Sequence, residues 1–150
     1  MNLRHQFECA HVEHAEILEF LKVWEDVLNL LASDDSDARH RGLRLLQNLE
    51  PKIVSICEHC RQEEDDPESP LFRFAESADR GRMKDEHFRL FRANYDFRTE
   101  MQFATVSSTA DLVQQGQRLL AALRGHILYE EGLLKRFEQE QLRTPELVAQ

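Results

Sequence analysis

The chain has 150 residues, the size of one domain with one hydrophobic core. It carries 28 acidic and 19 basic residues, and a net charge of -9 argues against a nucleic-acid, phosphate or anionic-membrane surface, which needs clustered Lys and Arg. Five Gly and four Pro are too few for a many-turned β-sandwich, whereas 41% hydrophobic residues suffice for a folded helical core.

The first expected helix has inward residues at steps of three or four, which places them on one face. One histidine interrupts this otherwise apolar stripe, which consists of Phe7, Ala10, His14, Ile17, Leu21, Trp24 and Leu28. The Asp and Ser residues at 33–37 form a polar turn suited to capping the next helix.

The second expected helix covers about residues 38–64, with apolar residues from Leu46 to Ile56 facing inward. Pro51 has no N–H to donate, so we expect a kink or a short break near Glu50. The acidic, proline-containing segment 65–70 ends this helix. The apolar residues that follow predict a short helical turn at the end of the bundle: Leu71, Phe72 and Phe74.

Two further helices are expected in the second half. The third begins between Asp79 and Met83 and faces inward through Met83, His87, Leu90, Asn94, Phe97 and Met101, with Phe88 and Phe91 widening the apolar face. The fourth follows a loop at 106–109 and shows the alternating four- and three-residue spacing of a bundle seam. Its inward residues are Leu112, Gly116, Leu119, Leu123, His126, Glu130, Leu133 and Phe137.

These elements predict an all-α, antiparallel up-down-up-down four-helix bundle with a short extra helical turn between helices two and three. We expect one domain over 1–150, with its core at about 7–142, helix four ended by Thr144 and Pro145, and a tail at 143–150. Three cysteines, with no apolar run long enough for a signal peptide or membrane span, favour a reduced, cytoplasmic protein.

Six ligand-type side chains recur on the inward faces of the four helices. Each half of the sequence contains a histidine and then a His-x-x-x-Glu motif, which gives His14, His59, Glu63, His87, His126 and Glu130. Residues four apart on a helix have Cβ atoms roughly 5–6 Å apart, so each motif can direct both side chains toward one centre. Buried carboxylates need compensation, and no Arg or Lys occupies the inward positions near His126 and Glu130. The pattern therefore predicts a dinuclear metal centre, and its nitrogen and oxygen ligands suit iron, manganese or zinc.

With these residues the chain resembles the hemerythrin-like family of four-helix, cation-binding domains. The resemblance extends from about His11 to Phe137 and depends on the segments 13–14, 59–64, 85–87 and 126–131. It implies two non-haem irons with a bridging oxo or hydroxo species, for which zinc or manganese could substitute. The four histidines would be terminal ligands, and Glu63 and Glu130 would be bridges.

The chain departs from this family at two places. Oxygen carriers of the family have a second histidine one turn after the helix-three histidine, and here that position is Phe91. One metal would then lack a protein ligand and be open to water, oxygen, nitric oxide or a substitute side chain, which favours sensing, stress response or iron handling over bulk oxygen carriage. The segment from Asp65 to Pro70 replaces a continued helix, so we expect that end of the bundle to be more open.

Several neighbouring residues have alternative roles. His11 could be a substitute ligand or a hydrogen-bond partner, but we favour a partly exposed rim residue. We favour solvated helix faces over bridging for Glu64 and Glu131, and surface or helix–helix polar contacts for Glu13, Glu58 and Glu86. We favour ordinary packing over donation to a metal-bound oxygen for Tyr95 and Tyr129.

The cysteines offer a further metal or redox hypothesis. Cys57 and Cys60 flank His59 in a C-x-x-C arrangement, which is found in zinc and redox sites. On a continuous helix their sulfurs share a face away from His59, and there is no second Cys pair to complete a zinc site. We therefore favour packed thiols, and the same for Cys9.

Two alternative functions are weighed against the di-iron hypothesis. A ferritin-type site needs Glu-x-x-His on two helices, and only Glu8 with His11 fits that motif. A metal-free or zinc-stabilised protein-interaction module would use the acidic surface with Phe72, Phe74, Phe88 and Phe91. No nucleophile–base set or phosphate loop is visible, so enzymatic turnover is not predicted, and both a monomer and a homodimer remain open.

Overall fold

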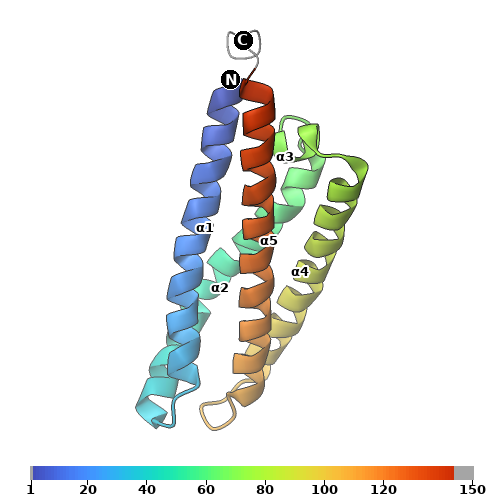
Figure 1. Cartoon of the computed structure of the whole chain (residues 1–150). Helices are drawn as coiled ribbons and strands as arrows, with labels where there is room; N and C mark the ends of the chain where they lie inside the picture. Colours follow the sequence, from blue (N-terminus) through green and yellow to red (C-terminus); the bar gives the residue numbers. More distant parts are fainter. Residues whose placement is uncertain (1, 144–150) are drawn as a thin grey trace.

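The computed structural model describes residues 2–143, which form five helices and no strand. The helices are α1 (Leu3–Leu31), α2 (Ser36–Asp65), α3 (Pro70–Phe74), α4 (Ser77–Phe103) and α5 (Ala110–Leu142). The four long helices lie side by side, and α3 sits near the end where α1 begins and α5 ends (Figure 1). α1 packs against α2 and α5, and α4 packs against α5 and α2. The expected all-helical fold and the short turn after the second helix are confirmed.

The periodic stripes mark the buried faces as expected. All eight seam residues of α5, from Leu112 to Phe137, are buried. On α1 every residue of the expected stripe is buried except Ala10, which is half-buried. One part of the apolar core surrounds Trp24 and Phe97, and another surrounds Phe7 and Phe137 near α3. Polar ligand-type side chains therefore lie within an otherwise apolar interior.

Side chains cap the starts of α1 and α2 and hold one loop. The Asn2 side chain accepts a hydrogen bond from the His5 amide at 2.8 Å, and Asp35 caps α2 by accepting from the Asp37 amide at 3.2 Å. The hydroxyl of Thr109 donates to the Leu31 carbonyl at 2.9 Å instead of capping α5. That bond ties the connection between α4 and α5 to the end of α1.

The structure differs from the sequence-based expectations in the continuity of α2, in the start of α4 and in the exposure of two phenylalanines. α2 runs through Pro51 without a break, because the buried turns on both sides of it, at Leu46 and Ile53, hold the helix in the core. α4 begins at Ser77, before the expected start. Phe88 and Phe91 do not widen the buried face, since they are 62% and 57% exposed.

Two expectations concern the ends of the chain and the membrane. Most of the expected tail lies outside the described residues, which end at 143. Within residues 2–143, every helix is too short or too polar to cross a lipid bilayer.

Gly116 is closely packed against α1 and α4, whereas Gly125 of the same helix has free space around it, so the same substitution should have opposite effects on stability at the two positions. A Cβ there would lie 2.7 Å from a methyl carbon of Leu28 and 3.1 Å from the Phe97 ring, and both of these side chains are enclosed. Gly116→Ala should therefore lower the free energy of unfolding by about 1–3 kcal/mol. At Gly125 nothing lies within 4 Å of an added Cβ, so Gly125→Ala should raise it by about 0.5–1 kcal/mol. Urea unfolding of both variants checks the difference in sign.

Candidate metal centre

A fully buried carboxylate lies at the centre of three histidines. Glu130 on α5 is 0% exposed, and its oxygens lie 3.5 Å from His14 Nε2, 3.7 Å from His87 Nε2 and 3.3 Å from His126 Nε2. None of these contacts has hydrogen-bond geometry, and both Glu130 oxygens lack a partner among the described residues. The α1, α4 and α5 stripes thus bring predicted ligands together around an acceptor that is unsatisfied.

The other nitrogen of each of these rings is held by a second carboxylate. His14 Nδ1 lies 2.6 Å from Glu131, His87 Nδ1 lies 2.5 Å from Glu64, and His126 Nδ1 lies 2.8 Å from Glu86. Because a carboxylate only accepts, each Nδ1 carries the hydrogen and donates it. This arrangement orients an imidazole to present the Nε2 lone pair to a metal.

The inward nitrogens then face each other without an obvious donor. His87 Nε2 and His126 Nε2 are 2.8 Å apart, and their rings meet edge to face. With both Nδ1 atoms protonated, two neutral rings would direct two lone pairs at one point, which is repulsive. Either an extra proton or a metal cation between them removes the conflict.

The charges around Glu130 also shift the pKa values of the cluster. Burial raises the pKa of Glu130, but the three histidines outweigh it and hold that pKa well below its usual range. Burial lowers the pKa of His14, yet Glu130, Glu131 and Glu63 outweigh it and raise the pKa to about 9. Burial likewise lowers the pKa of His126, and the bonds and charges of Glu130 and Glu86 raise it above its ordinary value. In the absence of metal, protons take the place of a cation.

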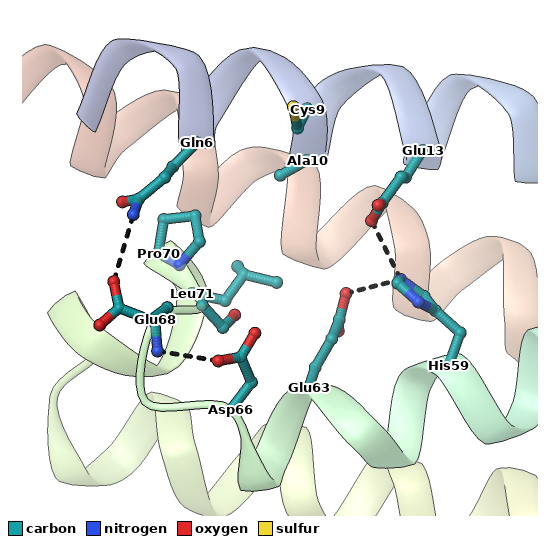
Figure 2. Close-up of a pocket in the computed structure, with 11 residues that line it drawn as sticks. Gln6, Cys9, Ala10, Glu13, His59, Glu63, Asp66, Glu68, Pro70 and Leu71 are labelled. Carbon is teal, nitrogen blue, oxygen red and sulfur yellow. Dashed lines mark hydrogen bonds and ion pairs between the residues drawn. The ribbon is translucent and has the colours of Figure 1, made fainter. Parts of the chain in front are cut away.

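His59 and Glu63 form the open side of the cluster. The His59 Nε2 atom lies 3.0 Å from Glu63 and 3.3 Å from Glu13, and the His59 side chain is 33% exposed (Figure 2). Glu63 also lies 3.9 Å from His14 Nε2, and one Glu63 oxygen is buried without a hydrogen-bond partner. Burial and the charge of Glu130 raise the pKa of Glu63, although His59 opposes this. Two groups here have ligand atoms within 4.8 Å of one another and could hold a metal ion: Glu13, His59 and Glu63, and His14, Glu63 and Glu130.

A cavity of about 400 Å³ opens beside His59 and Glu63, where α2 ends at Asp65. The loop after α2 and the start of α3 line its other side through Asp66, Glu68 and Pro70 (Figure 2). This cavity lies at the segment 65–70, the end that was expected to be more open. A small solute can approach His59 and Glu63 through it.

The four helix pairings repeat between the two halves of the chain. In each half, the glutamate before the first histidine contacts the second histidine: Glu13 with His59, and Glu86 with His126. The second glutamate of each His-x-x-x-Glu-Glu motif contacts the first histidine of the other half: Glu64 with His87, and Glu131 with His14. Glu13 and Glu86 thus make the expected helix–helix contacts, whereas Glu64 and Glu131 are bonded to the predicted ligands His87 and His14 rather than solvated.

The remaining candidates fall around the cluster. His11 is 26% exposed and contacts Glu131 and Glu138, each at 2.8 Å, so it is a rim residue that also supports the partner of His14. Tyr95 is 67% exposed and is not packed, and the Tyr129 hydroxyl donates to Asp79 at 2.7 Å. Phe91 is 57% exposed and lines a cavity together with His87 and Glu64. Cys57 and Cys60 are half-buried and buried free thiols, and Cys9 is half-buried.

One residue of this cluster, Cys60, was not among the predicted ligands. Cys60 is 1% exposed, and its sulfur lies within 4.8 Å of the ligand nitrogens of His87 and His126. On α2 it is adjacent to His59 and lies about 100° around the helix, which suggested a separate face. The spacing of residues along α2 alone does not predict that Cys60 lies close to α4 and α5.

Comparison with known proteins adds no relative: no family model, curated protein or solved structure matches this chain.

The pKa of His14 predicts how the metal-free protein responds to pH. Its folded pKa of about 9 exceeds the value of about 6.5 expected when unfolded. This protonation stabilises the fold fully below about pH 6.5, and the stabilisation is lost as the pH rises through about 9. The urea concentration at the unfolding midpoint of chelator-treated protein should therefore decrease as the pH rises from 6.5 to 9.5. A flat profile would contradict a protonated His14.

Proposed function

We propose that the chain is a non-haem di-iron protein that responds to oxygen, nitric oxide or iron, rather than a bulk oxygen carrier. One observation supports this most: three Nε2 atoms surround the buried, unpartnered carboxylate of Glu130, while carboxylates hold every opposite Nδ1. This set of nitrogen and oxygen acceptors is suited to binding cations. His14, His59, His87 and His126 would be terminal ligands, and Glu63 and Glu130 would be shared by the two ions.

The fold we propose with it is the antiparallel up-down-up-down bundle of the hemerythrin-like family. The short connections at residues 32–35 and 104–109, which make antiparallel neighbours the simplest arrangement, support this topology. The order of the sequence colours along adjacent helices in Figure 1 also supports it. Each helix then contributes one histidine at the same level of the bundle.

Bound iron would supply the redox chemistry and the position at which a small diatomic molecule binds. The residues of the chain set access to that position. His59 and Glu63 line the cavity at the end of α2, and His87 lines a second cavity of about 440 Å³ together with Glu64, whereas Glu130 is fully enclosed. A ligand as small as oxygen or nitric oxide fits the cavity at the end of α2, and the carboxylates at its mouth favour a neutral or cationic solute over an anion.

Anaerobic reconstitution of the chain with ferrous iron tests the function. Metal analysis should give close to two irons per chain, and oxygen and nitric oxide should each change the optical spectrum with a saturable titration. Fewer than one metal per chain, with unfolding unaffected by a chelator, would overturn the metal-binding function. Two tightly bound irons without any optical response would overturn the response to diatomic ligands.

A second candidate function is a protein-docking face on α4. Four aromatic side chains with helical spacing are 57% to 77% exposed there: Phe88, Phe91, Tyr95 and Phe103. Exposed aromatic stripes of this kind mark interaction sites. Phe72, which the interaction hypothesis included, is buried and cannot contribute. Chain assembly that depends on Phe88 and Phe91 but not on iron would favour this function.

A further inference from the structure

A buried sulfur lies beside the His87–His126 pair. The Cys60 sulfur and the ligand nitrogens of both histidines come from three helices and lie within 4.8 Å of one another. All three residues are buried. Glu130, 0% exposed and without a hydrogen-bond partner on either oxygen, lies 3.7 Å from His87 and 3.3 Å from His126. One sulfur and two nitrogens therefore form a single group, and the Glu130 carboxylate lies beside the two nitrogens.

We infer that Cys60 is a metal ligand, and that its thiolate completes a sulfur-containing half of the metal pair with His87, His126 and Glu130. The other half has only nitrogen and oxygen ligands, from His14 and His59 together with the carboxylates of Glu63 and Glu130 that the two ions would share. This assignment rests on the proposed metal-binding function. It identifies the side chain that takes the place of the helix-three histidine that this chain lacks.

The sulfur is present in only one half of the cluster. Cys60 directly follows His59, and the residue directly after His126 in the matching motif is Ile127, which is 0% exposed. The two His-x-x-x-Glu-Glu motifs otherwise make equivalent contacts. The presence of Cys60 in one motif and of Ile127 in the other therefore makes the two halves of the cluster chemically different. Thiolate ligands favour zinc, ferrous iron or cobalt over manganese or magnesium, so the sulfur half should bind such ions first.

Binding at Cys60 requires the thiol to lose its proton. Burial, together with the negative charges of Glu130 and Glu63, raises the pKa of Cys60 well above its ordinary value, so the metal-free thiol keeps its hydrogen. A divalent cation reverses this local charge: the metal–sulfur bond forms as the S–H bond breaks, and the proton passes to solvent. No change of oxidation state is involved.

Cys57 provides a matched control on the same helix. It lies one turn before Cys60 and lines a cavity together with His87 and Glu64, but among the described residues it belongs to no group that could hold a metal. Both residues are free thiols. A spectroscopic signal from sulfur ligation should therefore depend on Cys60 and be indifferent to Cys57.

Cobalt titration of the metal-free chain tests the assignment without reference to activity. Thiolate ligation gives Co²⁺ an intense near-ultraviolet charge-transfer absorption that imidazole and carboxylate ligands do not give. The wild-type chain and Cys57→Ser should show it, saturating at one cobalt per chain. Cys60→Ser should lose the absorption and bind the first cobalt on the order of 10- to 100-fold more weakly.

The outcomes separate this assignment from the proposed function. Two bound cobalt ions without the charge-transfer absorption, or an absorption that Cys57→Ser abolishes, would overturn ligation by Cys60 and leave the metal site standing. No cobalt binding at all would overturn both. If Cys60→Ser fails to fold, X-ray absorption of the zinc-loaded wild-type chain decides the matter, because a sulfur neighbour of zinc at about 2.3 Å is either present or missing.

Discussion

Replacing His126 by alanine is expected to remove at least one of two bound metals and most of the metal-dependent stability. His126 is 2% exposed and contacts Glu130 at 3.3 Å, Glu86 at 2.8 Å and His87 at 2.8 Å. Its loss leaves Glu86 and Glu130 without an imidazole on that side. A metal present at 100 times its dissociation constant stabilises a fold by about 2.7 kcal/mol. For a chain of this length, that loss lowers the thermal midpoint by about 5–10 °C.

Metal analysis and calorimetry, each with and without a chelator, measure both effects. His40→Ala is the matched control, because His40 is an exposed helical histidine away from the cluster and should keep the full metal content. If His126→Ala retained two metals and the wild-type midpoint, the cluster would not be a metal centre.

Glu130→Gln is expected to have the largest effect on the binding of the two proposed metals together. The amide keeps the shape of the side chain but loses the charge that all three inward nitrogens share. Affinity for the second metal should fall by at least about 100-fold, the upper end of what a supporting carboxylate contributes. In the metal-free chain, the pKa of His14 should drop from about 9, because Glu130 is the largest influence raising it.

Both consequences can be measured on one sample series. Isothermal titration gives the metal affinities, and the pH dependence of the urea midpoint above pH 6.5 should become shallower in Glu130→Gln. Glu138→Gln serves as the control, since Glu138 contacts His11 and not the inward nitrogens. An unchanged second affinity in Glu130→Gln would rule out a shared carboxylate.

Helical periodicity was sufficient to predict the all-helical fold class and most of the inward residues. The α5 seam was correct at every position because its apolar, small and ligand-type residues repeat with one period. The same argument failed for Phe91 on α4, where hydrophobicity was taken for burial. Phe91 is adjacent to the buried Leu90, and a step of about 100° turns it out of the packed face.

The polar contacts between helices could not be predicted in the same way. Glu64 and Glu131 appear on their own helices as charges one position beyond the inward glutamates. Their roles depend on histidines of other helices, His87 and His14, and therefore on how the helices are rotated against each other. Cys60 was missed for the same reason: two adjacent faces of α2 line different parts of one cluster.

The histidine–glutamate pairs also form a closed ring around the bundle. His14–Glu131 joins α1 to α5, Glu86–His126 joins α5 to α4, Glu64–His87 joins α4 to α2, and His59–Glu13 joins α2 back to α1. Apolar side chains could repack if one helix slid along its neighbours by a turn, about 5.4 Å, because their contacts have little direction. Such a slide would break two polar pairs at once and leave buried charges unmatched. The ring therefore locks the axial register of all four long helices, whatever ion it encloses.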